Sequence, residues 1–418
     1  MRRFIFIVTV FLLVAYSLTS ASEHQVQNYI EIAVNNNSQL KSIKNQWQAE
    51  VERIDVSTKL PDPKFSFGVF VENVETAVGP QEYKIGLFQK LPWFGKLSTA
   101  RKIQVHQAEI AWVKYQQAID ELTFQIQELL YKIALNREQL SITKETLVLT
   151  GQWSEILRAK YQNSTKSYAD IIKVRQEIAR QEEAITSLDR EYRQLIVSLK
   201  SVLEVDILAP VKAEMERQLK EKDLNNMQEL ALANNPDLQI VRLKKQIAQL
   251  MNKRASQNLI PDAGIGVDYI LTGDKYQSGG AKVNESGKDP LVFMLSLELP
   301  LQWRKIKKNI NATEYQQQSA KDMETELQKG ILANLENLII SLEDMSGKYK
   351  MYTGQIIPMT KESLAIRTAE LKTGKTDIYK LIEDQRDLLE YQLKQAEILT
   401  NYSITNAKIA KLTGSAVQ

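Results

Sequence analysis

The sequence has no cysteine among its 418 residues and only two histidines, His24 and His106. Without cysteine the chain can form no disulfide, carry no thiol nucleophile and accept no lipid on an N-terminal cysteine. The two histidines are far apart and lack neighbouring ligands, so a metal site or a histidine general base is not expected. We therefore predict no catalytic residue, no metal and no cofactor, and expect that the protein is not an enzyme.

A long apolar run is missing from everything that follows the first 21 residues. Residues 1–21 combine Arg2 and Arg3 with an apolar stretch from Phe4 to Leu18 and a small-residue end at Ala21, the pattern of a cleaved signal peptide. The alternative, a single N-terminal anchor, would need about 20 spanning residues. The chain is therefore expected to be exported without lipidation, and any further membrane contact must use strands.

Excess charge of one sign and frequent helix breakers are also lacking. The chain has 54 Lys plus Arg against 51 Asp plus Glu, and the basic residues form no block, so nucleic acid is not an expected partner. Only 10 prolines and 16 glycines interrupt the sequence, which predicts long helices.

Four short segments recur in the same order at offsets of roughly 200 to 210 residues, which indicates an internal repeat. The paired segments are Ala33–Leu40 with Leu232–Leu238, Leu60–Asp62 with Ile260–Asp262, Leu91–Trp93 with Leu299–Trp303, and Tyr161–Ser167 with Leu371–Asp377. We predict a first structural repeat at 22–205 and a second at 206–418.

Apolar residues at three-four spacing predict long helices that pack as coiled coils. The seams are Ile119, Leu122, Ile126, Leu129 and Ile133; Ile171, Val174, Ile178, Ile185, Leu188, Tyr192, Leu195 and Leu199, broken only by Gln181; and Ile331, Leu335, Leu338, Leu342 and Met345. Residues 97–160 and 304–370 are each predicted to form one helix of about 100 Å. The seams alone would favour an ordinary dimeric coiled coil, and what argues against it is the sequence between the helices.

Alternating apolar and polar residues predict four strands, at 64–78, 82–91, 262–272 and 290–300. Residues 73–81 are expected to form a short loop in the first hairpin, and 273–289 a longer external loop. Strands of this length suit a bilayer, where one face meets lipid and the other water. A soluble hairpin pair packed on helices would alternate in the same way.

Aromatic residues follow each hairpin, Trp93 and Phe94 in the first half and Trp303 in the second, beside basic residues as in a membrane-interface girdle. Four strands cannot close a barrel, and open edges do not persist in lipid, so a membrane-embedded chain must oligomerise. Two copies would supply eight strands and three would supply twelve. A duct needs the wider lumen, which favours three.

The order of these elements, with the segment Phe88–Leu97 containing Pro92-Trp93-Phe94-Gly95-Lys96, resembles the TolC-like outer-membrane efflux protein family. The resemblance covers essentially the whole mature chain, although the second repeat lacks the glycine. It implies a mainly α protomer with a small β part. Three such protomers would form a twelve-stranded outer-membrane β-barrel joined to a periplasmic α-helical barrel.

The resemblance also implies partners and sites. A periplasmic adaptor and an inner-membrane transporter would dock at two helix-turn-helix tips, containing Asn163, Ser164, Thr165, Gly374, Lys375 and Thr376. A periplasmic gate is expected just past the second tip, where Lys380 replaces one of the family's two acids and Glu383 matches the other. With Asp377 and Asp384 beside them, we predict a mixed-charge constriction in which Lys380 forms local pairs. Solvated helix-tip charges without a gating role are the alternative.

Two other readings of the sequence remain open. The chain could be a soluble periplasmic coiled-coil adaptor or scaffold whose four strands form a small extramembrane sheet. An exported hydrolase would need a nucleophile motif or metal-ligand spacing, and the sequence has neither.

Overall fold

A computed structural model describes residues 21–162, 167–206, 219, 222–373, 375 and 377–414. The predicted signal peptide at 1–21 thus lies outside the described residues except for Ala21. The chain folds as two compact units: unit 1 comprises Met1–Ser42, Gln116–Pro236 and Gln328–Gln418, and unit 2 comprises Ile43–Tyr115 and Asp237–Leu327.

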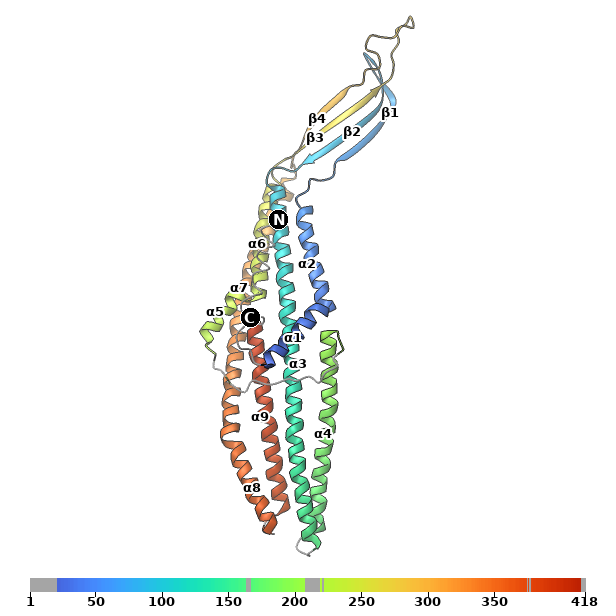
Figure 1. The fold of residues 1–418 in the computed structure, drawn as a ribbon. Helices are drawn as coiled ribbons and strands as arrows, with labels where there is room; N and C mark the ends of the chain where they lie inside the picture. The colour runs from blue at the N-terminus through green and yellow to red at the C-terminus, as the bar shows by residue number, and fades with distance from the viewer. Residues whose placement is uncertain are drawn as a thin grey trace. The chain divides into compact units, whose positions relative to one another are not determined.

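Unit 2 contains one antiparallel sheet, β1-β2-β3-β4, with its strands in chain order (Figure 1). The strands are β1 Lys64–Thr76, β2 Gly79–Leu91, β3 Asp262–Thr272 and β4 Leu291–Glu298. All four predicted strands are therefore present. Residues 262–272 match their predicted bounds, while the other strands differ from theirs by one to three residues at an end.

The predicted loop at 73–81 is wrong. β1 and β2 stay paired up to Thr76 and Gly79, so only Ala77 and Val78 form the turn. Gly79 has a φ of 139°, a region that favours glycine, and the Thr76 hydroxyl donates to its carbonyl at 2.6 Å. Residues 74–76 and 79–81 of the predicted loop instead pair with each other, beyond a register shift between Val69 and Val74.

Helices precede and follow the strands of this sheet along the chain, and they make up the rest of both units. Unit 2 holds α6 (Pro236–Gln257) and the adjoining parts of three helices that continue into unit 1: α2 (Ser38–Val56), α3 (Lys96–Gln162) and α7 (Trp303–Met351). In unit 1 these are joined by α1 (Ala21–Asn36), α4 (Tyr168–Leu203), α5 (Leu224–Asn234), α8 (Ile357–Thr373) and α9 (Ile378–Leu412).

The single helix predicted at 304–370 is interrupted. α7 ends at Met351, and a π-helical segment, η1 (Tyr352–Ile356), precedes α8. Pro358, which the prediction overlooked, is the second residue of α8. Because proline has no N–H to donate to the carbonyl four residues earlier, the wider π turn lets the helix continue across the break.

The predicted seams form the interior of unit 1. Ile126, Ile133 and Leu335 are fully buried, and Ile171 and Val174 join a cluster with residues from α3, α8 and α9. The polar residue that breaks the α4 seam, Gln181, is buried as well. The core therefore follows the predicted spacing but contains a polar layer.

Candidate channel elements

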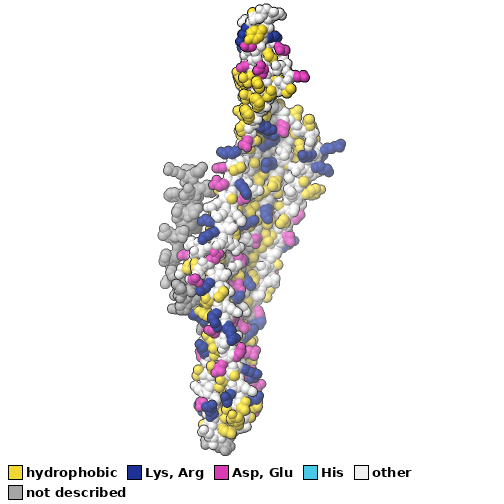
Figure 2. Space-filling view, turned by 90° about the vertical axis from the view of Figure 1, so that its right-hand side faces the viewer, with side chains coloured by type: hydrophobic (Ala, Val, Ile, Leu, Met, Phe, Trp, Pro, Cys, Tyr) yellow, Lys and Arg dark blue, Asp and Glu magenta, His cyan; other side chains and the backbone are white. Residues whose placement is uncertain are grey.

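The sheet has one apolar face that is exposed in the single chain. Odd-numbered residues of β1 and β4 project from it, with Phe65 69% exposed, Phe67 59%, Phe293 80% and Leu295 77%. Hydrophobic side chains gather over this sheet in the space-filling view (Figure 2). An apolar face of this extent on a soluble protein would be unusual and marks an interaction surface.

The opposite face of the sheet carries charged residues and glycines, together with apolar side chains such as Phe88 and Met294. Lys84 forms an ion pair with Asp268, whose side chain is only 4% exposed. Lys90 pairs with Glu298 and lies 3.4 Å from the Asp262 carboxylate. The glycines on this face are Gly68, Gly86, Gly264 and Gly266. The two faces thus differ as the predicted alternation requires.

The segment Pro92–Lys96 connects β2 to α3 through a turn in which Gly95 has a φ of 89°. The backbone N–H of Trp93 donates to the Asp262 carboxylate at 3.0 Å, and the Lys96 ammonium donates to it at 2.6 Å. Lys96 also donates to the Ile260 carbonyl at 3.0 Å. The motif of the first half is therefore held by Ile260 and Asp262 of the second half.

The predicted girdle residues lie where the chain passes from strand to helix: Trp93 and Phe94 between β2 and α3, and Trp303 at the start of α7. Trp93 is 39% exposed, Phe94 89% and Trp303 70%. Trp93 and Phe94 contact edge to face, with ring centroids 5.9 Å apart. Large exposed aromatics at these positions fit a membrane interface, and this role stays a prediction.

The predicted external loop at 273–289 is tied to the first hairpin. Gly287 N–H donates to the Val78 carbonyl at 2.8 Å, and the Lys275 ammonium donates to the Thr76 carbonyl at 2.7 Å. The Asp289 carboxylate accepts from the Tyr269 hydroxyl and from the Thr272 N–H, and these bonds hold its pKa below the usual range. The loop is thus anchored at both ends.

Most predicted adaptor-contact residues lie outside the described residues. This applies to Asn163, Ser164, Thr165, Gly374 and Thr376. Lys375 is described: its side chain is exposed and its N–H donates to the Glu370 carbonyl at 3.0 Å. The exposed rings of Tyr161 and Tyr168, 5.7 Å apart, flank the first tip.

The four predicted gate residues lie on the first two turns of α9, but their surroundings differ. Asp377 is the N-cap residue of α9 and accepts from the Tyr379 N–H at 3.0 Å. Asp384 accepts from Ser363 Oγ at 2.5 Å and from Arg367 Nε at 2.6 Å. Lys380 and Glu383 are exposed, and neither forms an ion pair with another described residue. The mixed-charge constriction therefore stays a hypothesis.

An ion pair that the sequence did not predict joins α4 to α9. Arg386 donates to the carboxylate of Glu177, which is almost completely buried. The two residues are 209 positions apart, and each alone resembles one of many helix-surface charges. Only Gln181, the polar residue that interrupts the α4 seam, signalled a polar layer in this region.

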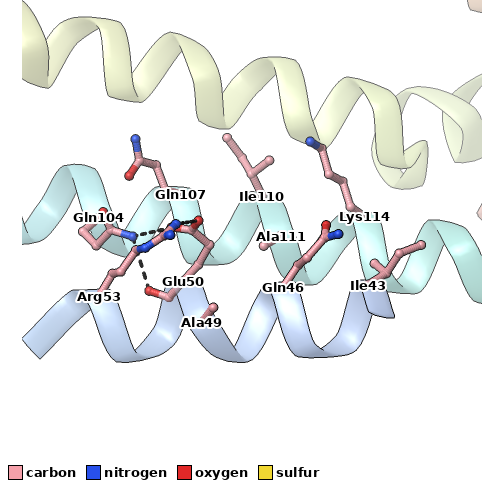
Figure 3. Close-up of a pocket in the computed structure, with 10 residues that line it drawn as sticks. All are labelled: Ile43, Gln46, Ala49, Glu50, Arg53, Gln104, Gln107, Ile110, Ala111 and Lys114. Atoms are coloured by element: carbon pink, nitrogen blue, oxygen red, sulfur yellow. Dashed lines mark hydrogen bonds and ion pairs between the residues drawn. The ribbon is translucent and has the colours of Figure 1, made fainter. Parts of the chain in front are cut away.

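A groove of about 630 Å³ lies between α2 and α3 in unit 2. Figure 3 shows Glu50 in this groove, linked to Arg53 and to Gln104, whose amide donates to the Glu50 carboxylate at 2.6 Å. Its other lining residues are Ile43, Gln46, Ala49, Gln107, Ile110, Ala111 and Lys114. The ten lining residues mix apolar side chains with amides and charged groups, and they include no convergent catalytic set.

In the part of the chain that the structure describes, no three His, Asp or Glu side chains cluster closely enough to hold a metal ion. Among the described helices, none combines the length and apolar character needed to cross a membrane.

Comparison with protein-family models identifies the class. The model described as "Outer membrane efflux protein" matches residues 29–203 and 228–415, which is most of the chain. The chain therefore belongs to the outer membrane efflux protein family. The two matched ranges lie one in each predicted repeat, although the repeat bounds themselves stay a prediction. Comparison with curated protein sequences finds no match.

Solved structures share the fold over nearly the whole chain. CusC has a TM-score of 0.77 at 14% identity, covering 96% of this chain and 95% of that one. VceC from Vibrio cholerae has a TM-score of 0.76 at 12% identity, covering 94% and 96%. The open state of MtrE from Neisseria gonorrhoeae has a TM-score of 0.73 at 15% identity, covering 96% and 94%.

Family and fold together define the class. The protein is an outer-membrane channel of the efflux type, with a periplasmic portion, and its fold is mainly helical with a four-stranded antiparallel sheet. The soluble adaptor or scaffold that the sequence left open is not favoured by this family membership.

Proposed function

We propose that three copies of this chain close one twelve-stranded barrel in the outer membrane and continue as a periplasmic helical duct. The observation that carries this proposal is the open sheet: β1 and β4 each pair with only one other strand of the described chain. An edge strand left open in lipid would expose unpaired N–H and C=O groups, each costing several kcal/mol.

The two faces of the sheet set its orientation in such a barrel. The apolar face containing Phe67 and Phe293 would meet lipid, and the face with the Lys84–Asp268 pair would meet the water-filled lumen. Trp93, Phe94 and Trp303 would then lie at the periplasmic interface, and the 273–289 loop would lie outside the cell. Three copies are favoured over two because eight strands leave a lumen that side chains fill.

The duct itself would be passive. Energy would come from an inner-membrane transporter acting through a periplasmic adaptor, which membership of the efflux family supports. The adaptor would contact the two tips around 163–165 and 374–376. Cleavage of residues 1–21 during export would release the mature chain into the periplasm.

Engineered disulfides test the barrel directly, because the chain has no cysteine of its own. Val69→Cys in β1 would be combined in turn with Phe293→Cys, Leu295→Cys and Leu297→Cys in β4, since the register between copies is undetermined. In the barrel, β4 of one copy lies beside β1 of the next, so at least one pair should yield a covalently linked trimer after oxidation in membranes.

The matched control replaces Val69→Cys by Ile85→Cys on the same face of β2. Within one copy β3 separates β2 from β4, which puts their Cα atoms about 10 Å apart, too far for a disulfide. The control should give no linked species. A protein that stays monomeric without detergent, with no cross-link from any β1–β4 pair, would overturn the proposal.

A further inference from the structure

A layer of buried polar side chains lies inside unit 1, between the helix pairs α3/α4 and α8/α9. Its members, named here the polar layer, are at most 4% exposed: Thr150 and Trp153 of α3, Glu177 and Gln181 of α4, and Gln385 of α9. Trp153 is also a member of the apolar cluster that contains Leu157, Val174 and Leu381, so the polar layer joins that cluster directly.

Two contacts place these residues at one level along the helices. Gln181 Nε2 donates to Thr150 Oγ1 at 3.1 Å, which fixes the register of α3 against α4. Because these helices are joined in a hairpin and run antiparallel, Trp153 lies at the level of Glu177, one turn nearer the tip. The Arg386–Glu177 ion pair places Gln385 at that same level. All five residues thus fall within about two helical turns.

Four polar atoms of this layer have no hydrogen-bond partner among the described residues. They are the Trp153 indole Nε1, the Gln181 Oε1, and both amide atoms of Gln385. Buried polar groups in folded proteins are nearly always paired, with protein or with ordered water. Ordered water or a direct pairing of the amides would satisfy these four atoms.

The chemistry of the set selects the ligand. Trp153 and the Gln385 amide nitrogen can only donate, whereas the two glutamine oxygens can only accept. A cation would be repelled by the donors, and an anion would be repelled by the acceptors and by the Glu177 carboxylate. Water both donates and accepts, and buried water typically makes about three hydrogen bonds to groups of this kind.

We propose that the polar layer is a buried water-binding site at the joint between the two halves of the chain. α3 and α4 belong to the first predicted repeat, and α8 and α9 to the second. A dry apolar joint loses all its contacts when its helices separate, but water can replace the hydrogen bonds of a hydrated joint.

The first test is a structure of the full chain in detergent or nanodisc at a resolution that shows ordered water. Water should lie at roughly 2.7–3.2 Å from Trp153 Nε1 and from the Gln385 amide. Direct pairing of the Gln181 and Gln385 amides with no water beside Trp153 would overturn the proposal.

The second test uses Gln385→Leu, with Gln392→Leu as the matched control, since Gln392 lies on the same helix outside the layer and is partly exposed. If water fills the layer, the leucine displaces it and leaves Trp153 Nε1 and Gln181 Oε1 without a hydrogen-bond partner. Hydrogen exchange of the α4 amides around Glu177 should then accelerate by about tenfold relative to the control. Slower exchange in Gln385→Leu than in the control would show that the layer is dry.

Discussion

The guanidinium of Arg386 in α9 donates two hydrogen bonds to one carboxylate oxygen of Glu177 in α4, at 3.0 Å from Nε and 2.6 Å from Nη2. The partners are unequally placed, because the Glu177 side chain is 5% exposed and the Arg386 side chain is 50% exposed. The pair links helices from different halves of the chain. Because the two side chains are unequally buried, removing one should destabilise the protein more than removing the other.

Arg386→Ala should destabilise unit 1 more than Glu177→Ala. Removing the arginine leaves a buried carboxylate without its main partner, at a cost of roughly 3 kcal/mol. Removing the glutamate leaves an arginine that water can reach, which costs about 1–2 kcal/mol for the lost charge-assisted bonds. Urea unfolding of the detergent-solubilised protein measures the difference.

The control for this comparison is the exposed ion pair between Arg193 and Asp189 on α4, where the side chains are 69% and 62% exposed. Arg193→Ala should change stability by less than about 1 kcal/mol. Equal effects of Arg386→Ala and Glu177→Ala would contradict the assignment of Glu177 as the buried partner.

Asp377 offers a way to separate helix capping from gating. Asp377→Asn keeps an oxygen that can accept from the Tyr379 N–H, so stability should stay near that of the wild type while the charge is lost. Asp377→Ala removes both, and should destabilise the start of α9 by about 1 kcal/mol. If Asp377 also acts in the gate, both variants should lower the cation selectivity of single channels in planar bilayers. A selectivity unchanged in Asp377→Asn would leave capping as its role.

The exposed gate residues and the ion-paired one should affect ion selectivity differently. Lys380 has no ion pair with a described residue, so Lys380→Ala should raise cation selectivity if the constriction exists. Asp384 is compensated by Arg367 at 2.6 Å, so Asp384→Asn should change selectivity less than Glu383→Gln. Single-channel reversal potentials measured in a salt gradient test this order. The reverse order would show that the Asp384–Arg367 pair opens in the assembled channel.

The strands and the helical seams were predictable because they depend on local spacing. Phe65 and Phe67 alternate with polar residues, and Ile126 and Ile133 recur at helical intervals, so the buried or apolar face is visible in the sequence alone. The first hairpin was harder. Its register shift between Val69 and Val74 depends on cross-strand pairing, which no local pattern reports.

The candidate site was only partly predictable, for a related reason. Asp377 and Asp384 were found from their positions past the tip, but the partners that change their role, Ser363 and Arg367, are recognisable only once α8 and α9 pack together. Glu177 and Arg386 were missed because a charged residue on a long helix normally faces water. Burial of such a charge is decided by tertiary contacts.

The Phe88 ring lies against Gly264 in the sheet, so a substitution of one residue should offset the effect of a substitution of the other. Phe88 pairs with Gly266, and a Cβ added at Gly264 would lie 2.2 Å from the Phe88 ring. Gly264→Ala should therefore displace the ring and lower the thermal stability of the detergent-solubilised protein. Combining it with Phe88→Ala removes the clash, so the double variant should lose less than the two single variants together. Additive losses would mean that the ring and Gly264 are not in contact in the assembled protein.

Acid should weaken unit 2 through Glu324 in α7. Hydrogen bonding from Lys245 of α6 holds the pKa of the Glu324 carboxyl below its usual range, and nearby Arg242 adds to this effect while burial opposes it. Because the pKa of Glu324 is lower in the folded state, its ionised carboxylate stabilises the fold fully at any pH well above the unfolded-state pKa of about 4.3. The contribution is then lost as the pH falls through the lower, folded-state value.

Urea midpoints at about pH 7 and about pH 3.5 should differ less in Glu324→Gln than in the wild type, because the glutamine cannot titrate. Glu326→Gln, an exposed residue on the same helix, is the matched control and should keep the wild-type pH dependence. A pH dependence unchanged in Glu324→Gln would show that other carboxylates dominate the acid response.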